Sequence, residues 1–596
     1  MSIKKTILTT LAFFSLLIGY SCAPVAYRAG LSFGPSESKW VSQTLNRLTL
    51  EEKIGQMIVC SYSGRFLNRE SQKLQRLKSL VVNSKIGGLI LFGGNVYETA
   101  LLTNSLQKLA KVPLLIASDL ERGLGNQIEG ATQFPPLMAL GAIDSKEQAY
   151  LMGKVTAIEA RACGIHLTYA PVVDVNINPL NPIINTRSFG EKPELVSHLA
   201  NAFIRGCQEN GLLATAKHFP GHGDTDLDSH SLLPTVKADL NRLEKVELFP
   251  FHQAIKAGVS AIMTAHLQLP ALDSTPNLPA TLSPRIITGI LRGKLGFKGL
   301  IVTDAMGMGG ITTLYSPPEA ALKAILAGVD MILLPPQPEK VIESLIQAAR
   351  RGDIPITRIN SSVKRVLEAK AKVGLHRQKL VDINILDKKI GAPLHLQLAQ
   401  RMFENAVTLV KNEHQLLPIS PLKQKVAVFS LSSDPGGYFA GRTFALEVEK
   451  RSPEVLSFFA DAYTGKKFLN EDIAQAQQAD VIIFALFSSL RAGKGSVDLC
   501  PRHADLIRQA ASGEIPAVVI SFGSPYFLLH FPEVDGYLCA YRSSPEAQVA
   551  AAKAIFGEID IKGKLPVSIP GLYPIGHGMI LPKKQNNNYS EFSSFK

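Results

Sequence analysis

The stretch LLATAKHFPGHGDTDLDSH, residues 212–230, joins a short apolar run to a loop dense in glycine, histidine and aspartate. Residues 212–218 predict a buried β-strand, because a short apolar run that ends at turn residues is typical of one. Pro220, Gly221 and Gly223 come next and aspartates at alternate positions follow, a pattern that excludes a helix or a regular strand. We therefore expect a strand that ends in a long loop, the kind of segment in which binding and catalytic residues concentrate.

The same unit, an apolar run followed by a polar loop and a helical pattern, repeats through residues 36–376. Thr49 and Glu52 have the spacing of a capping box, which indicates the start of the first helix of this region. Strands that alternate with helices predict a parallel sheet, and eight of them predict a (β/α)8 barrel. The predicted strands are residues 54–60, 86–92, 112–119, 167–174, 212–218, 259–266, 299–304 and 329–334.

Six polar residues stand at the downstream ends of these predicted strands. Barrel active sites are built at the carboxyl ends of the strands, where such side chains converge. A single polar residue there would indicate little, but six together favour a binding or catalytic site. The six are Asp119, Asp174, Lys217, His218, His266 and Asp304.

A linker with little periodicity, residues 377–395, leads to a second region, residues 396–582. Helical patterns such as 396–409 and 503–511 separate four further apolar runs in this region. The alternation predicts a parallel sheet with helices on both faces, so the expected fold class is α/β: a barrel followed by an αβα sandwich. The predicted strands are residues 425–430, 479–487, 517–522 and 537–541. Residues 583–596 are polar and predict a disordered tail.

Residues 1–22 predict an export signal. Lys4 and Lys5 precede an apolar stretch, residues 7–18, and small residues surround Cys22, which is the order of a charged, an apolar and a cleavage region. A cysteine at this junction indicates a bacterial lipid attachment site. We expect an exported protein, either periplasmic or anchored to a membrane through Cys22.

The composition argues against several other classes of function. The formal net charge is +13, but Lys and Arg are scattered and no basic run alternates with aromatic residues, so we expect no nucleic-acid partner. The cysteines after Cys22 have no C-x-x-C spacing, which argues against a metal or redox centre. No later segment has the roughly 18 apolar residues of a membrane span.

The aspartates of the loop raise the question of metal binding. A calcium loop that began at Asp224 would need Gly at its sixth position and Glu at its twelfth, where this chain has Ser229 and Thr235. A zinc site of three histidines stays open as an alternative, although no H-E-x-x-H spacing supports it. Its ligands would be His218, His222 and His230. We expect no metal and no cofactor.

The loop resembles the signature of the family 3 glycoside hydrolases, in their β-N-acetylglucosaminidase branch, and the resemblance covers nearly the whole chain after the signal. The matching runs are KHFPGHGDT and DSH within residues 217–230, TLEEKIGQM at 49–57, APVVD at 170–174, RSFG at 187–190, VTDAM at 302–306, LVKN at 409–412, LLP at 416–418 and KLPVS at 564–568. One departure from the family pattern is the run ERGLGNQ at residues 121–127. The branch often has a further arginine near the end of this run, and this chain does not. Gln127 lies near that position and cannot supply its charge.

The resemblance implies roles for particular residues of this chain. Asp304 would be the nucleophile, which forms a covalent glycosyl-enzyme. His230 would be the acid/base, because imidazole titrates near physiological pH, and Asp228 would accept a hydrogen bond that fixes its tautomer. The implied substrate contacts are Asp119, Arg187, Lys217 and His218.

The activity implied by the resemblance is retaining hydrolysis of terminal β-linked N-acetylhexosamine, with peptidoglycan fragments among the expected glycans. Two enzymatic alternatives are a β-glucosidase and a phosphorylase of the same family. Glucosidase relatives lack the Pro-Gly-His-Gly and Asp-Ser-His elements, whereas a phosphorylase would use histidine as acid/base to spare phosphate from carboxylate repulsion. A more remote alternative is an inactive glycan-binding lipoprotein.

Overall fold

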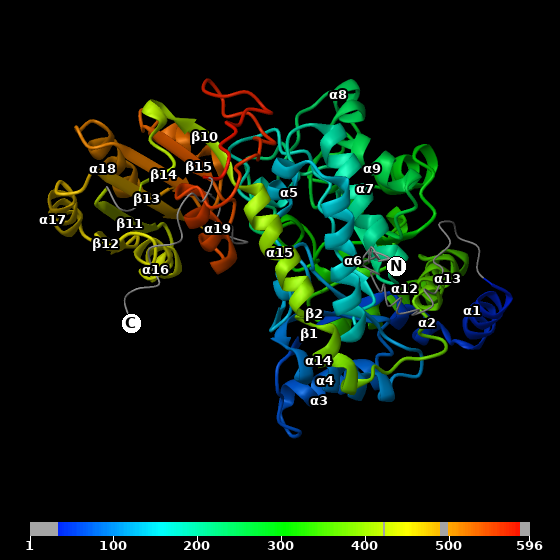
Figure 1. Ribbon diagram of the computed structural model, residues 1–596. Coiled ribbons are helices and arrows are strands. Elements are labelled where there is room, and N and C mark those ends of the chain that lie inside the picture. The colour runs from blue at the N-terminus through cyan, green and yellow to red at the C-terminus, as the bar shows by residue number, and fades with distance from the viewer. Residues whose placement is uncertain (1–33, 421–423, 489–498, 585–596) are drawn as a thin grey trace, which may run out of the picture.

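The computed structural model describes residues 34–420, 424–488 and 499–584, which form two α/β regions side by side (Figure 1). The predicted signal, residues 1–22, lies outside the described residues, as does the predicted tail from residue 585 onward. Within the described ranges, no helix is both long and apolar enough to cross a membrane.

The first region is a parallel barrel. Its strands are β1 Ile58–Gly64, β2 Gly88–Asn95, β3 Leu115–Ser118, β5 Leu167–Thr168, β6 Leu213–Phe219, β7 Ala261–Thr264, β8 Leu300–Val302 and β9 Ile332–Leu333, with a short addition, β4 Ile128–Glu129, beside β2. They pair in the order β8-β7-β6-β5-β3-β2-β1-β9, and each of these pairs is parallel. A backbone bridge between Val302 and Met331 joins the two ends of this order. The predicted barrel is therefore confirmed.

Helices surround the barrel strands (Figure 1). They are α1 Pro35–Arg47, α2 Leu50–Gln56, α3 Gln72–Val82, α4 Val96–Leu109, α5 Leu137–Ile143, α6 Lys146–Ala162, α7 Pro193–Glu209, α8 Leu240–Lys245, α9 Leu248–Lys256, a π-helix Arg285–Lys294, α10 Gly309–Thr312, α11 Pro317–Ala327, α12 Pro338–Arg351, α13 Ile356–Lys372 and α14 Leu386–Lys389. One boundary prediction was wrong: residues 54–56 belong to α2 and not to the first strand. The capping box of Thr49 and Glu52 is present, and the helix that it starts runs to Gln56 before β1 begins.

Apolar side chains fill the inside of the barrel. Val59, Ile90, Leu213 and Val302 come from four different strands, and each is at most 2% exposed. Val366 of α13 belongs to the same cluster and is fully buried at the amino ends of the strands. Because the interior is a packed apolar core, the carboxyl ends of the strands are the place where polar groups can gather.

The second region is a mixed sheet between two layers of helices. Its strands are β10 Thr408–Asn412, β11 Val426–Ser432, β12 Val455–Ala460, β13 Val481–Phe487, β14 Ala517–Ser521 and β15 Gly536–Cys539, in the order β10-β15-β14-β13-β11-β12. One apolar cluster includes residues of α17 Lys466–Ala476 and α18 Pro501–Ala511, and another includes residues of α15 Pro393–Ala406, α16 Arg442–Glu449 and α19 Pro545–Ile555. The αβα sandwich is therefore confirmed.

Two details of this region differ from the sequence prediction. The predicted helix 396–409 ends at Ala406, because Thr408 begins β10, and β10 pairs antiparallel with β15. The sheet is therefore not wholly parallel. Strand β12, residues 455–460, was not predicted, because its residues are only partly buried at the edge of the sheet and lack a strong apolar pattern.

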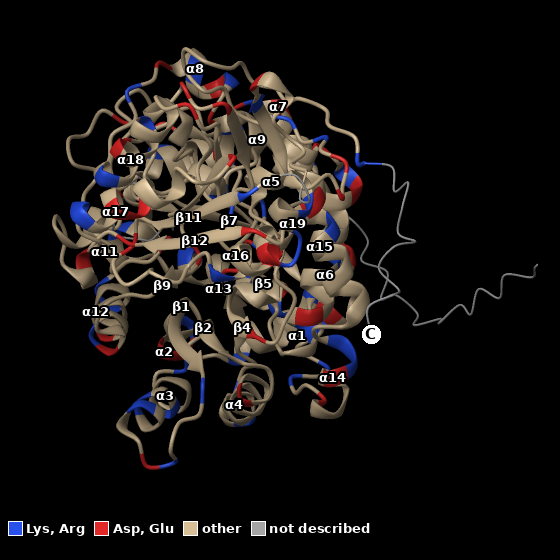
Figure 2. Cartoon of the chain, turned by 60° about the vertical axis from the view of Figure 1, so that its left-hand side comes forward, with Lys and Arg blue, Asp and Glu red and all other residues tan. Residues whose placement is uncertain are grey.

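The second region packs against the barrel loop that follows β5, residues 169–192. Asn176 donates to the Tyr526 hydroxyl over 3.1 Å, and the Glu191 carboxylate accepts from the Ser568 amide over 2.8 Å. Charged residues lie mostly on the helices and loops around the sheets, while strands such as β1 and β2 carry none (Figure 2). The bonds of Asn176 and Glu191 to the second region hold in place the loop that carries Arg187.

Candidate active site

Polar side chains from several barrel strands meet at the carboxyl end of the barrel. Lys217, on β6, donates to Asp119 after β3 over 2.8 Å, and His218 Nδ1 lies 2.7 Å from Asp174 after β5. The Lys217–His218 peptide bond is cis. All six polar strand-end residues singled out in the sequence therefore lie at one end of the barrel, as the topology predicts.

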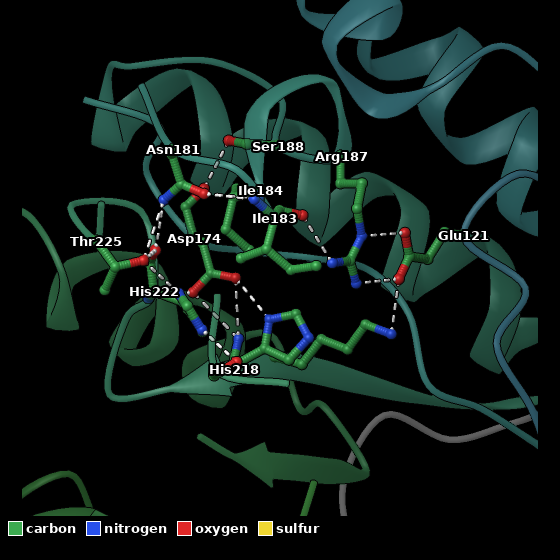
Figure 3. Close-up of polar contacts among 12 residues, drawn as sticks. Glu121, Asp174, Asn181, Ile183, Ile184, Arg187, Ser188, His218, His222 and Thr225 are labelled. Carbon is green, nitrogen blue, oxygen red and sulfur yellow. Dashed lines mark hydrogen bonds and ion pairs between the residues drawn. The ribbon is translucent and has the colours of Figure 1, made fainter. Parts of the chain in front are cut away.

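The first part of the site, here called the clamp, consists of Asp119, Glu121, Arg187 and Lys217. Figure 3 shows the Arg187 guanidinium turned toward the Glu121 carboxylate. Lys217 Nζ lies 2.8 Å from Asp119 Oδ1 and 2.7 Å from Glu121 Oε1. Arg187 meets both oxygens of Glu121, at 2.9 and 2.7 Å. Two cations and two carboxylates are thus matched, and Asp119, whose side chain is 27% exposed, is the carboxylate most open to a ligand.

Burial and neighbouring charges shift the pKa values of Glu121 and Lys217 in opposite directions. Burial alone would raise the pKa of Glu121, but the charges of Arg187 and Lys217 and their hydrogen bonds hold it well below its ordinary value. Burial alone would lower the pKa of Lys217, but Asp119 and Glu121 raise it. Glu121 and Lys217 are therefore both charged at neutral pH. Glu121 was not among the predicted site residues, although its place two residues after Asp119 was the available signal.

The second part of the site is a buried network around Asp174. This carboxylate accepts from the backbone amide of His222 over 2.7 Å as well as from His218 Nδ1 (Figure 3). Burial would raise the pKa of Asp174, and the His218 ring, with other partners, lowers it. Asp174 therefore fixes the ring of His218 so that Nε2 is the nitrogen left for a ligand; among the described residues no atom bonds it. Asp174 was among the six polar strand-end residues expected at this site, although no catalytic or substrate-binding role was predicted for it.

His222 has a structural place in this network. Its Nδ1 lies 2.8 Å from the Thr225 hydroxyl and its Nε2 lies 2.8 Å from the Ser229 hydroxyl. Burial lowers the pKa of His222 to about 4, so the ring is neutral at physiological pH. Since both ring nitrogens have protein partners, His222 is not arranged as a ligand in the zinc site that the sequence left open.

Asp228 and His230 form a pair in the loop after β6. Asp228 Oδ1 lies 2.7 Å from His230 Nδ1 and also accepts from the His230 amide over 2.9 Å. The Asp228 side chain is 2% exposed and the His230 side chain 35% exposed. The carboxylate therefore holds Nδ1 in its protonated form, and Nε2 is left to exchange protons with a ligand.

Asp304 lies two residues after the end of β8. Its amide donates to the Thr264 carbonyl on β7 over 3.1 Å, and its Oδ1 accepts from the Ala305 amide over 2.7 Å. Burial would raise the pKa of Asp304, but the charges of His218 and His266 and other partners lower it. The group is thus an anion at neutral pH, which a nucleophile must be.

His266 links the two catalytic candidates electrostatically. Burial lowers the pKa of His266, Asp304 raises it, and the His230 ring lowers it. The backbone gives a second link, because the Gly309 amide after Asp304 donates to the His230 carbonyl over 2.8 Å. The structure therefore brings together all seven predicted site residues, while the roles of these residues stay predictions. They are Asp119, Arg187, Lys217, His218, Asp228, His230 and Asp304.

The turn that departs from the family pattern, residues 121–127, supports the backbone of Asp119. Asn126 donates to the Asp119 carbonyl over 2.9 Å, and Gln127 accepts from the Gly93 amide over 3.1 Å. These bonds hold the backbone of Asp119 in place. The side chain of Gln127 is committed to the turn and brings no charge to a ligand.

Comparisons with known proteins agree with this architecture. Residues 49–369 match the glycosyl hydrolase family 3 N terminal domain, and residues 407–593 match the glycosyl hydrolase family 3 C-terminal domain. The chain is 32% identical to beta-hexosaminidase A of Pseudoalteromonas piscicida, over 88% of this chain and 97% of that one.

Two solved structures are similar along most of their length. One is a family 3 beta-N-acetylglucosaminidase from Paenibacillus sp. str. FPU-7, with 32% identity, a TM-score of 0.78 and coverage of 88% of this chain and 99% of that one. The other is a beta-glucoside phosphorylase, with 28% identity, a TM-score of 0.82 and coverage of 92% and 99%. The two domain matches and the similarity to the hexosaminidase over 88% of the chain show that this protein belongs to glycosyl hydrolase family 3 and is a glycosidase.

Proposed function

We propose that this glycosidase is a retaining β-N-acetylhexosaminidase that releases terminal β-linked N-acetylglucosamine. The observation that carries the proposal is the Asp228–His230 pair, 2.7 Å apart, on a loop whose backbone bonds to the segment after Asp304. The names of relatives at about one-third identity support the substrate class.

In the first step, the Asp304 carboxylate attacks the anomeric carbon of the sugar, and the bond from that carbon to the aglycone oxygen breaks. His230, protonated at both nitrogens, gives its Nε2 proton to the departing oxygen. Asp228 stays ionised and stabilises the charged ring before the transfer. The product of this step is a covalent glycosyl ester of Asp304 and a free aglycone.

In the second step, a water molecule attacks the anomeric carbon and gives a proton to the neutral His230 ring. The ester bond to Asp304 breaks, and the sugar leaves with its original β configuration. Asp119 presents an acceptor and Lys217 a donor to the sugar hydroxyls, and His218 offers its Nε2 atom. These three groups would hold the ring in place through both steps.

The experiment is turnover of a panel of chromogenic glycosides by the wild type, by His230→Ala and by Asp226→Ala, an exposed aspartate of the same loop. We expect the N-acetylglucosaminide to be the best substrate and the His230 variant to lose on the order of 10²- to 10⁴-fold in kcat. Azide should restore part of this loss, because it attacks the glycosyl ester without a base. A glucoside as best substrate, or a His230 variant as active as the Asp226 variant, would contradict the proposal.

A phosphorylase is the second candidate, because the similar structure with a TM-score of 0.82 is a beta-glucoside phosphorylase. A phosphate ion would then replace water in the second step and leave as sugar 1-phosphate. Product analysis with and without phosphate separates the two. A hydrolase gives free sugar in both conditions, whereas a phosphorylase forms sugar 1-phosphate and turns over faster with phosphate.

We also propose that the enzyme is exported, acts on peptidoglycan fragments, and is anchored through Cys22. The support is the order of charged, apolar and small residues in the first 22 positions. Fractionation of cells that express the full chain or Cys22→Ser is the test. The wild type should stay with the membrane and the variant should be released; an identical distribution would contradict the anchor.

A further inference from the structure

The loop with His230 and the segment after Asp304 meet through backbone groups. The Gly309 amide donates to the His230 carbonyl over 2.8 Å, and the Gly310 amide donates to the Ser229 carbonyl over 3.1 Å. These two amides are the first of helix α10, whose N-cap residue, Met308, makes no side-chain capping bond. The first amides of a helix have no partner within it, so the catalytic loop itself supplies the acceptors.

The close approach requires glycine at this point. A Cβ atom on Gly309 would lie 2.2 Å from the Ser231 carbonyl oxygen, and one on Gly310 would lie 3.1 Å from the Leu232 carbonyl oxygen. Neither glycine has a left-handed φ, so the contact with the loop, and not the local backbone conformation, is what a side chain would disturb.

The contact reaches the His230 ring through a tight turn. The Asp228 carbonyl accepts from the amides of Ser231 and Leu232 over 3.0 and 3.1 Å, while the Asp228 carboxylate holds the ring. A shift of residues 229–231 must therefore move the ring as well. We propose that Gly309 is a positioning residue: its amide, with that of Gly310, holds the catalytic loop at the distance from Asp304 that proton transfer needs. This inference rests on the acid/base role proposed for His230.

Three glycines within four residues provide a graded test. Gly307 is the matched control, because a Cβ there would have its nearest neighbours at 3.8 Å. Gly309→Ala should lower kcat on the order of 10²-fold, since a displacement of about 1 Å can cost that much. Gly310→Ala should lower kcat less, and Gly307→Ala should leave it unchanged.

The dependence on the leaving group separates positioning from general damage to the fold. A dinitrophenyl leaving group needs no proton, whereas an unactivated alkyl leaving group does. In kcat/KM, which reports the first step, Gly309→Ala should therefore lose far more on the alkyl glycoside than on the dinitrophenyl glycoside, as His230→Ala does. It should keep the melting temperature of Gly307→Ala. The sugar of both test glycosides is the one that the wild type prefers. The wild type alone therefore tests the N-acetylhexosaminidase proposal, and the glycine variants test the positioning role.

Two results would overturn the inference. One is a Gly309 variant with the kcat of the Gly307 variant. The other is a loss of kcat/KM that is equal for both leaving groups, in Gly309→Ala or, if that variant does not fold, in Gly310→Ala.

Discussion

The two ends of the barrel each bury a lysine, and the two lysines have opposite electrostatic surroundings. Lys217 at the carboxyl end is 2% exposed and lies within 2.8 Å of two carboxylates, which raise its pKa. Lys370 at the other end is fully buried, and its Nζ contacts the amide oxygen of Gln56 at 2.5 Å. Burial lowers the pKa of Lys370 to about 7.

The two lysines differ in their partners, because Lys217 meets two carboxylates whereas Lys370 meets a neutral amide. At the carboxyl end, each buried cation has an anion, so the clamp is both stable and ready to bind hydroxyl groups. At the amino end, a lysine is buried against a neutral amide, which stabilises the charged form only weakly. The same residue type should therefore support folding at one end and oppose it at the other.

Lys217→Met should have the largest effect. It leaves Asp119 without its partner and Glu121 with Arg187 alone, so it should destabilise the fold by about 3–5 kcal/mol. It also removes a donor to the sugar, so kcat/KM should fall on the order of 10²-fold or more. Thermal unfolding and kinetics of the same preparation measure both effects. An active variant with an unchanged melting temperature would show that the clamp is dispensable.

Lys370→Met should act in the opposite direction, because it removes a desolvated charge. The lost hydrogen bond to Gln56 offsets part of this gain, so we expect a net stabilisation of about 1–3 kcal/mol near pH 7. Activity should not change, since the lysine lies at the other end of the barrel. Melting temperature and turnover at pH 7 measure the two expectations.

The pH dependence of this gain follows from the lowered pKa of Lys370. The unfolded chain holds the lysine proton up to about pH 10.4, whereas the folded chain releases it near pH 7, so the wild type gains stability as pH rises through this window. The advantage of Lys370→Met should be full below pH 7 and should shrink toward pH 10. Lys364→Met, on the exposed face of the same helix, is the control. A constant advantage across the window would contradict the account.

Glu339→Gln should have the smallest effect. Glu339 meets Arg76 at 3.2 Å through two bonds, but the side chains are 48% and 62% exposed. Solvent screens such a pair, so its loss should change stability by less than about 1 kcal/mol. A large loss at this surface pair would mean that contact distance, and not burial, decides what an ion pair contributes here.

Much of the fold could be predicted because its signals are local. The apolar runs of the barrel strands and the capping box of Thr49 and Glu52 depend on neighbouring residues alone. The edge strands β10 and β12 could not be predicted in this way. Thr408 follows a helix almost directly, and β12 is only partly buried, so tertiary pairing decides both.

The candidate site could be predicted only in part. Asp304, His218 and Lys217 stand at strand ends, where the topology itself brings them together. Glu121 lies two residues beyond Asp119, and its role depends on the approach of Arg187 from another loop. The contact of Gly309 with the His230 loop involves backbone atoms only. A sequence pattern carries no direct signal for either.

The central claim is that Asp304 forms a covalent bond to the sugar. The most direct measurement is incubation with a 5-fluoro-N-acetylglucosaminyl fluoride, followed by intact mass and peptide mapping. The account predicts one added sugar per chain, on the peptide with Asp304, and none on Asp304→Ala. A label on another residue, or no label together with release of the α-anomer from a β-glycoside, would contradict it.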